Sequence, residues 1–255
     1  MSARIIALTN QKGGCGKTTT AVNLSAALAS MGQKILLFDM DPQGNASIHL
    51  GISIYDLPSS MYDLLVDQDK MVRDVIYKTL VENLDIVPSN IELSGAELEL
   101  VNIIGRESAL KDSMDGIENE YDFIFIDCPP SLGLLTLNAL TTSTEVMVPV
   151  QTEYFALEGM KKLLKSVEVV KRRLNHTLEV TGIIPTMYDV RTNLSDAIMG
   201  KIVEHFGDKV FKTKIRKNVR LAEAPSFGIP IGVHSPNSHG AHDYYHLAKE
   251  VLNHG

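Results

Sequence analysis

The chain has 255 residues, of which 44% are hydrophobic and 22% charged, and a formal net charge of −7 at pH 7. This composition is that of a globular protein with a substantial core, and the charge argues against a chain that coats nucleic acid over its whole surface. No apolar run approaches the roughly 18 residues of a membrane span. Two cysteines, Cys15 and Cys128, give no disulfide framework, so a cytoplasmic protein is expected.

Short apolar runs alternate with helix-patterned stretches along the chain. This alternation predicts an α/β fold, a mostly parallel twisted sheet flanked by helices on both faces. The predicted strands are 4–9, 34–39, 84–89, 122–127, 145–150, 180–186 and 209–215. No repeat or linker interrupts the pattern, so residues 1–255 are predicted to form a single domain, of which 51–120 is the least regular part.

Three helices are predicted from spacing and capping residues. The first covers residues 19–32, where alanines and leucines form an inward stripe and a glycine suits the C-terminal cap. The second covers 193–207, with Asn193 or Ser195 as its N-cap. The last lies at about 240–252.

The stretch NQKGGCGKTTT, residues 10–20, lies between the first predicted strand and the first predicted helix. Its backbone N–H groups and the helix dipole form an anion site, because the three glycines permit positive φ and close approach of a phosphate. Lys17 is predicted to bridge the β- and γ-phosphates of ATP, and the Thr18 hydroxyl to hold Mg²⁺. A glycine-rich turn that only connects strand to helix is the alternative. The other loop residues expected to contact ATP are Gly13, Gly14, Cys15, Gly16 and Thr19.

The loop departs from the usual phosphate-binding pattern, which has a glycine six residues before the lysine. Gln11 occupies that position, and Lys12 precedes the glycine pair. This arrangement resembles the deviant Walker A loop of the ParA/MinD group of P-loop ATPases. The resemblance implies that Lys12 contacts ATP across a nucleotide-sandwich dimer and acts on the partner subunit's phosphates, as an arginine finger does. The alternative is a solvated charge at a strand end.

Acidic residues end two further predicted strands. Asp39 and Asp41 belong to DMDPQ, and Asp127 ends FIFID. Open α/β sheets bind ligands at the carboxyl ends of their strands, so these acids are expected beside the loop. In the resemblance, Asp41 orients the attacking water and joins the Mg²⁺ site, while Asp39 supports the strand end or the metal shell. Asp127 has the Walker B position and is expected to bind Mg²⁺, directly or through water. The CPPSLG segment that follows resembles a switch.

Further segments resemble the chromosomal Soj/ParA partition ATPases and span most of residues 4–232. They are DMDPQGNAS, VPSNIELSGAELELV, DFIFIDCPPSLGLLTLNAL, PVQTEYFALEGM, TMYDVRTNLS and NVRLAEAPSFGIPI. The resemblance implies an ATPase with ATP and Mg²⁺ as cofactors, a homodimer formed on ATP binding, non-specific DNA binding, and hydrolysis stimulated by a ParB/Spo0J-type partner. The chain begins almost at the loop, so the short chromosomal type, associated with the nucleoid, is expected.

The stretch KVFKTKIRKNVR, residues 209–220, is basic and contains no acid. The resemblance singles out Arg191 and Arg220 as DNA contacts, and dimerisation would double the number of phosphates touched. The other expected DNA contacts are Lys214, Arg216 and Lys217. A solvated strand and loop is the alternative. The family commonly has Ile-Pro-Arg-Asn where this chain has Ile-Arg-Lys-Asn, and the asparagine, Asn218, is the expected adenine partner.

Two rival functions share the loop. A MinD-like membrane ATPase would end in a basic amphipathic helix, but the tail AHDYYHLAKEVLNHG has one lysine. An iron–sulfur carrier or reductase would need cysteines placed to bridge a cluster, and no C-x-x-C is present. Cys15 is either a reactive thiol of lowered pKa at a helix N-terminus or a small residue at a variable position. The pair His242 and His246 is disfavoured as a metal site.

Overall fold

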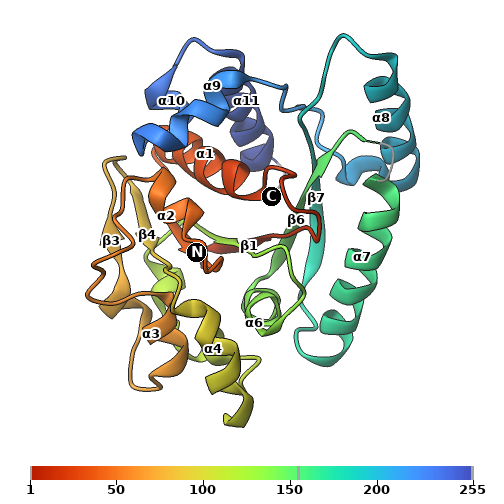
Figure 1. The fold of residues 1–255 in the computed structure, drawn as a ribbon. Coiled ribbons are helices and arrows are strands. Elements are labelled where there is room, and N and C mark those ends of the chain that lie inside the picture. The colour runs from red at the N-terminus through yellow and green to blue at the C-terminus, as the bar shows by residue number, and fades with distance from the viewer. Residues whose placement is uncertain (1, 154–155, 254–255) are drawn as a thin grey trace.

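A seven-stranded sheet forms the centre of the molecule (Figure 1). The computed structural model describes residues 2–153 and 156–253. In spatial order the strands are β3 (Tyr77–Lys78), β4 (Leu84–Val87), β2 (Ile35–Asp39), β5 (Phe123–Asp127), β1 (Arg4–Leu8), β6 (Glu145–Gln151) and β7 (Glu179–Thr186). All neighbours pair in parallel except β3, which is antiparallel to β4. The predicted fold class is confirmed.

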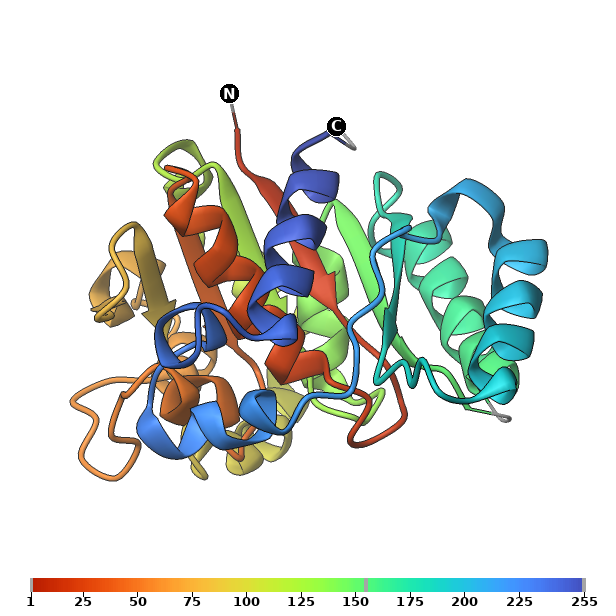
Figure 2. The same cartoon turned by 90° about the horizontal axis from the view of Figure 1, so that it is seen from above.

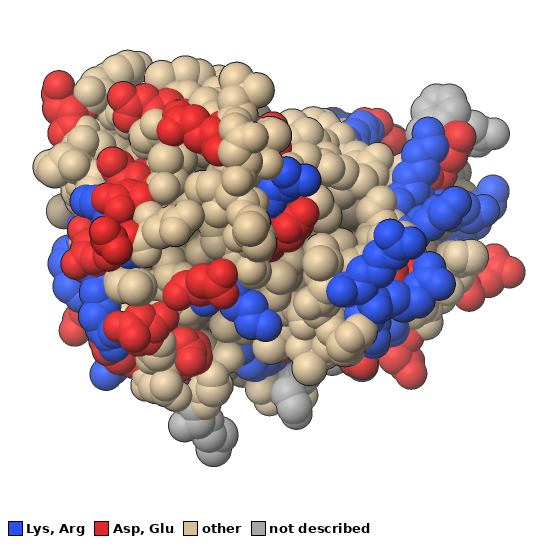
Figure 3. Space-filling model, turned by 90° about the horizontal axis from the view of Figure 1, so that it is seen from below, with Lys and Arg blue, Asp and Glu red and all other residues tan. Residues whose placement is uncertain are grey.

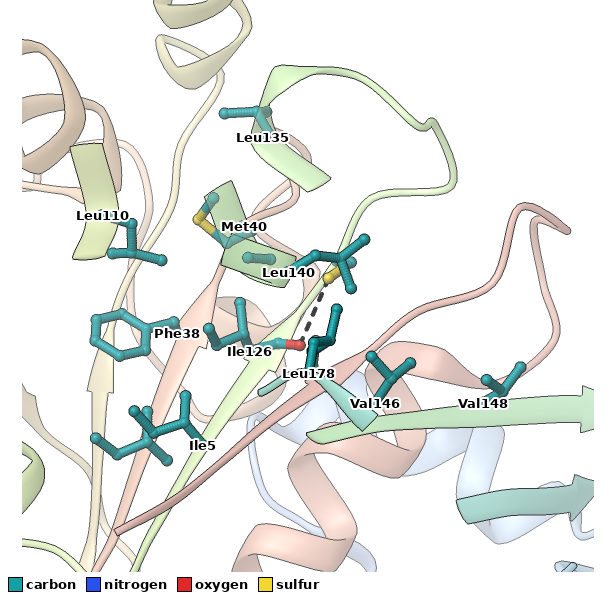
Figure 4. Packing of buried hydrophobic residues seen from close by; sticks show 14 of the residues in the cluster. Ile5, Phe38, Met40, Leu110, Ile126, Leu135, Leu140, Val146, Val148 and Leu178 are labelled. Atoms are coloured by element: carbon teal, nitrogen blue, oxygen red, sulfur yellow. Dashed lines mark hydrogen bonds between the residues drawn. The ribbon is translucent and has the colours of Figure 1, made fainter. Parts of the chain in front are cut away.

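The main helices cover both faces of the sheet (Figures 1 and 2). Helices α1 (Lys17–Ser30) and α11 (His239–Asn253) pack together on one face, and α6 (Leu134–Thr142) and α7 (Ala156–Arg173) lie on the other, with α8 (Asn193–Phe206) beside α7. Strand side chains alternate between the faces. In β1, Ile6 and Leu8 join the α1 and α11 cluster, whereas Ile5 and Ala7 join the α6 and α7 cluster. Figure 4 shows this second cluster, in which Phe38, Ile126 and Leu140 are fully buried.

Short helices connect the main elements. The α-helices among them are α2 (Asn45–His49), α3 (Met61–Val66), α4 (Leu93–Glu99), α5 (Ala109–Asp112), α9 (Val219–Glu223) and α10 (Ile231–His234). Single 3₁₀ turns cover Val72–Val75, Leu100–Asn102, Ile117–Asn119, Gly207–Lys209 and Ala224–Phe227. Many of them lie in 51–120, the region that sequence pattern left least regular, because such short turns carry no periodic signal.

The predicted C-terminal ends of the helices, which rest on glycines, agree with the structure, whereas the predicted N-terminal ends of α1 and α8 differ from it. Helix α1 begins at Lys17, two residues earlier than the predicted start at residue 19, and Gly32 follows its end with φ +86. The N-cap of α8 is Thr192, which is extended, so the prediction of Asn193 or Ser195 was wrong because Asn193 is already helical. Helix α11 confirms the prediction for 240–252.

The segment predicted as a strand at 209–215 is not one. It follows β7, and the Ile215 amide donates to the carbonyl of Pro185 at 2.8 Å. Pro185 has no N–H with which to donate a hydrogen bond back to the 209–215 segment, so the ladder of hydrogen bonds between this segment and β7 is interrupted. Glu250 of α11 accepts the Lys212 amide at 2.7 Å and removes another ladder donor. The 209–215 segment and the residue after it form only isolated β-bridges, one to β7 and one to the residues that follow β7.

The parallel strands fix where a ligand can bind. Their carboxyl ends meet at one edge of the sheet, and both chain ends lie towards the opposite edge (Figure 2). Within the described residues, no helix is both long and apolar enough to cross a membrane. The residues singled out from the sequence follow β1, β2 and β5, so they converge on the carboxyl edge.

Candidate functional site

The glycine-rich loop leaves β1 and enters α1 in a conformation that other residues hold. Gly14 and Gly16 have φ of +70 and +88, values that favour glycine. Asn10 accepts the Lys12 amide at 3.0 Å and donates to the Pro149 carbonyl at 2.7 Å. Thr186 of β7 donates its hydroxyl to the Cys15 carbonyl at 2.7 Å. Sequence reasoning missed Asn10 and Thr186, because their role is to support the loop across the sheet.

Lys17 and Thr18 form the first turn of α1, whose leading amides have no intrahelical partner. Lys17 is buried, and it lies close enough to Asp127 for its ammonium to oppose the rise in that carboxyl's pKa. A fourteen-residue helix that points its N-terminus at this spot favours an anion there. The loop therefore has the charge and donor geometry of a phosphate site.

Asp127 is a buried carboxylate without a hydrogen-bond partner. Both of its oxygens are buried, and neither has a partner in the described part of the chain. Burial raises the pKa of Asp127 well above its usual value, the neighbouring Asp39 raises it further, and the nearby Thr18 hydroxyl lowers it. That hydroxyl lies close to the carboxylate but outside hydrogen-bond geometry. Such an orphaned carboxylate fits a hard divalent cation or a water bound to one.

A purely protein-bound metal centre is not present in the described ranges, 2–153 and 156–253. No group of three or more His, Cys, Asp or Glu side chains is placed to hold a metal ion there. The residues that fit Mg²⁺ are instead Thr18, Asp127 and Asp41, so phosphate and water oxygens would have to complete the shell. Among these described residues, no third ligand accompanies the pair His242 and His246.

Asp39 and Asp41 lie beside Asp127 because β2 pairs with β5 in a register that aligns Asp39 with Asp127. Asp39 is fully buried, and it accepts the Ser47 hydroxyl at 2.7 Å, the Ser47 amide at 2.9 Å and the Asp41 amide at 3.2 Å. Burial raises the pKa of Asp39 to about 6 despite these bonds. Asp41 remains partly exposed at the carboxyl edge. The supporting role expected for Asp39 therefore has a geometric basis, and Ser47 is a partner that the sequence did not indicate.

A pocket of about 380 Å³ adjoins the glycine-rich loop. It lies between the start of α1 and the segment 215–219, and its lining is mostly apolar. The lining residues are Gly16, Thr19, Thr186, Met187, Ile215, Arg216, Lys217, Asn218, Val219, Leu221, Ala222 and Tyr244. Asn218 lines this pocket and caps α9 by accepting the Arg220 amide at 2.8 Å. The pocket has the place and character of a site for a nucleotide base.

Arg216 occupies the position where the family commonly has proline. Its amide donates to Asp243 of α11 at 3.0 Å, and its guanidinium pairs with the same carboxylate at 2.5 Å. The Asp243 side chain is 7% exposed and the Arg216 side chain 34%. Proline could make neither bond, so this substitution ties the pocket segment to α11.

Most of the cations predicted to contact DNA have partners within the chain. Arg191 pairs with Asp189 at 2.8 Å, and Arg220 pairs with Glu223 at 2.8 Å. Lys214 lies over the Tyr188 ring, 4.3 Å from its centroid. In the part of the chain that is described, Lys217 has no ion pair. The five residues do gather near the pocket, but their charges are largely compensated locally.

Lys12 points away from the loop that contains it. Its ammonium lies 2.5 Å from a carboxylate oxygen of Glu153 and 2.9 Å from the amide oxygen of Gln151. Gln151 ends β6 and Glu153 follows it, and the Lys12 side chain is 45% exposed. Lys12 is therefore an exposed cation held outside its own loop, whereas Lys17 is buried in the site.

Comparison with known proteins assigns the family. A family model described as an AAA domain matches residues 3–180. The sporulation initiation inhibitor protein Soj of Bacillus subtilis is 54% identical over 252 residues, which cover 99% of this chain and 99% of that protein. The chromosome-partitioning ATPase Soj of Treponema pallidum is 47% identical over 249 residues, or 98% of this chain and 97% of that one. The chain belongs to the Soj/ParA family of chromosome-partitioning ATPases.

Solved structures agree with the Soj/ParA fold. Cobyrinic acid a,c-diamide synthase of Mycobacterium smegmatis, crystallised with ADP and magnesium, superposes with a TM-score of 0.86 at 34% identity over 99% of this chain and 95% of that chain. The cell division ATPase MinD of Pyrococcus furiosus gives 0.81 at 27% identity over 99% and 100%. The family predicted from the loop and the flanking segments is confirmed.

The C-terminal helix weighs against the MinD-like alternative for this Soj/ParA-family chain. Helix α11 packs on α1 and buries its apolar side there. The buried apolar residues are Ala241, Tyr244, Leu247, Ala248 and Val251. An apolar side that is already used in the core is not available for insertion into a membrane surface.

Both cysteines of this Soj/ParA-family chain are 1% exposed. Burial raises the pKa of the Cys15 thiol, and the Lys17 ammonium only partly opposes that rise. The reactive-thiol interpretation of Cys15 was therefore wrong, because desolvation outweighs the helix N-terminus and the lysine. Burial also raises the pKa of Cys128. Neither buried thiol is placed to share an iron–sulfur cluster between subunits.

Proposed function

We propose that ATP bound at the carboxyl edge closes two copies of this chain into a dimer that binds DNA without sequence preference. Hydrolysis, stimulated by a ParB/Spo0J-type protein, then returns the chain to the monomer and releases DNA. The observation that carries the proposal is the orphaned, buried Asp127 carboxylate beside the N-terminus of α1. A buried charge without a partner is costly, so its retention in a phosphate site argues for a cation that arrives with the nucleotide.

Residue roles follow from position. Gly13, Gly14, Cys15 and Gly16 would cradle the phosphates, with Lys17 as the fixed cation. Thr18 and Asp127 would hold Mg²⁺, which neutralises phosphate charge when bound. Asp41 is partly exposed on a turn fixed by Asp39, where it can orient a water and contribute to the metal shell. The mycobacterial structure with bound ADP and magnesium supports this ligand pair for the fold.

Lys12 is assigned a role in the partner's site. Its ammonium is held outside its own loop by Glu153, an exposed pair that is worth less than about 1 kcal/mol. The partner's phosphates can therefore compete for Lys12 without a large cost. Hydrolysis and dimerisation would then depend on one residue, since a cation supplied across the interface completes the charge around the transferred phosphoryl group.

DNA binding is assigned to the predicted basic residues near the pocket, of which Lys217 has no ion pair among the described residues. Two copies would present this surface twice, and the affinity for phosphates rises steeply with the number of contacts. The proposal places the chain in the cytoplasm on the nucleoid and includes no membrane attachment.

Non-specific duplex binding by Asp41→Ala, a variant trapped before hydrolysis, tests this function across a salt series with ATP and with ADP. We expect binding with ATP alone, steeply weakened by salt. Lys217→Glu in the same background should weaken binding, and the matched control Lys111→Glu on α5 should not. A variant that dimerises on ATP yet binds no DNA with either nucleotide would overturn the DNA assignment.

A further inference from the structure

Helix α7 has a basic outer face that the family motifs do not involve. Its inward side chains recur at intervals of three and four and pack on the sheet; they are Met160, Leu163, Val167 and Val170. Its outward side carries six cationic residues and two acidic ones. The cations are Lys161, Lys162, Lys165, Lys171, Arg172 and Arg173, and the acids are Glu158 and Glu168.

Two of these cations are compensated within the chain. Arg172 lies 3.7 Å from Glu168, and Lys171 lies 3.3 Å from Glu179. Their position in the last turn, like that of Arg173, also has a structural reason, because cations interact favourably with the C-terminal end of the helix dipole. These three residues need no ligand to explain them.

The remaining three lysines have no such reason. Lys161, Lys162 and Lys165 are exposed and lie among the first ten residues of α7. They are far from the C-terminal turn, so the helix dipole does not stabilise a cation at these positions. Within residues 2–153 and 156–253 none of their ammonium groups has an ion pair or hydrogen bond. Lys161 and Lys165 are also four residues apart, a like-charge arrangement that destabilises a helix. Among the described residues, the fold forms no ion pair that would explain their placement.

The lysines form part of a larger charge pattern on one face. Figure 3 shows basic side chains gathered at one end of this face, over α7, while acidic side chains predominate at the other end. Because the whole chain has a net charge of −7, such a group of cations is a local positive field on an acidic protein. Helices α9 and α11 lie on the opposite side of the molecule, which Figure 2 faces.

We propose that Lys161, Lys162 and Lys165 on α7 form a second phosphate-binding surface for duplex DNA, separate from the basic residues beside the pocket. The stretch from Lys161 to Lys165 spans roughly 6 Å of helix. A duplex presents about three to four phosphate charges over that length. The inference rests on the proposed DNA binding and adds to it a surface on another face of the same chain.

The test compares salt dependence of ATP-dependent DNA binding in the Asp41→Ala background. The triple variant K161Q/K162Q/K165Q removes the three lysines, and K34Q/K70Q/K111Q removes the same charge elsewhere. We expect the first variant to lower the slope of log affinity against log salt by about 1 to 3 units per chain, with at least a roughly tenfold loss of affinity near physiological salt. The second variant should leave the slope unchanged. Unchanged melting temperatures in both variants would confirm that the exposed substitutions leave the fold intact.

The outcomes separate the two proposals. If the parent binds DNA and K161Q/K162Q/K165Q keeps the parent's slope and affinity, the α7 surface is overturned and the proposed function stands. If that variant keeps its DNA affinity but loses stimulation by the partner protein, the α7 surface is a docking surface for an acidic protein instead. The phosphate assignment is then wrong. If the parent binds no DNA, both proposals fail.

Discussion

The Asp127 side chain is a buried carboxylate whose environment affects both the stability of the chain and its candidate metal site. Its carboxylate is buried at the carboxyl end of β5, the middle strand of the sheet, in register with Leu8 of β1 and Asp39 of β2. Leu8 supplies no donor, Asp39 supplies a like charge, and both carboxylate oxygens lack partners within the described part of the chain. Lys17 and Thr18 compensate this acid only in part, so the nucleotide-free protein is less stable than its core alone would make it.

Asp127→Asn should stabilise the nucleotide-free protein at pH 8 while removing Mg²⁺-dependent ATP hydrolysis. The folded-state pKa of Asp127 lies above its unfolded value, so the wild type loses stability as pH rises from about 4 through the folded-state pKa. The gain of the variant should be near zero at pH 4 and reach roughly 1–3 kcal/mol at pH 8. Urea unfolding without nucleotide at several pH values measures it.

Asp41→Asn is the matched control for that experiment, because Asp41 is partly exposed at the same edge. It should impair hydrolysis without the pH-dependent gain in stability. Equal or lower stability of Asp127→Asn at pH 8 would contradict the uncompensated-charge argument. A wild type that gains no stability from Mg²⁺ with ATP would contradict the assignment of the cation site.

At the scale of elements, the segment between α8 and α9 is held by acids from α11. Glu250 accepts two of its amides, those of Lys212 and Thr213, and Asp243 accepts the amide and guanidinium of Arg216. The segment also lines the pocket beside the glycine-rich loop. Helix α11 therefore sets the position of one pocket wall, and the Arg216 pair is its firmest link.

Arg216→Ala should lower stability measurably, whereas Arg220→Ala should not. Removing Arg216 leaves the buried Asp243 carboxylate with only a backbone donor, a loss of about 1–2 kcal/mol after allowance for the exposure of Arg216. Arg220 and Glu223 are both exposed. Thermal unfolding of both variants measures the difference, and a double-mutant cycle with Asp243→Asn isolates the coupling. Equal losses for the two arginines would show that the α11 link contributes nothing.

Elements with strong local patterns were predictable from the sequence, and those set by distant partners were not. The buried parallel strands appear in the sequence as apolar runs, and the acids Asp39 and Asp127 end two of them. The gathering of these acids at the carboxyl edge of the sheet could therefore be predicted before the fold was known. The short strand β3 has two residues and carries no pattern. The partner of Arg216 lies 27 residues away on another helix, and no local signal marks it. Two cations of the basic stretch 209–220, Arg216 and Arg220, therefore pair with acids that the sequence pattern did not indicate.

At the scale of the whole molecule, the open space around Gly13 means that a substitution there can affect dimer formation without affecting the folding of the single chain. A Cβ built on Gly13 meets nothing within 4 Å, and its φ is not in the left-handed region. A larger side chain is therefore tolerated by the isolated chain. In a face-to-face dimer closed over the nucleotide, the same side chain would project into the interface.

Gly13→Val should fold with wild-type stability and bind ATP, yet remain monomeric and show no stimulated hydrolysis, because a branched side chain obstructs closure of the sandwich. Gly232→Val on α10 is the matched control, since it also has open space around it and lies away from the loop, and it should dimerise normally. Light scattering with ATP measures assembly, and a fluorescent nucleotide measures binding. Lys12→Ala should share the monomeric state and the loss of stimulation. An ATP-dependent dimer of Gly13→Val would mean that the loops do not face each other, and Lys12 would lose its assigned role in the partner's site.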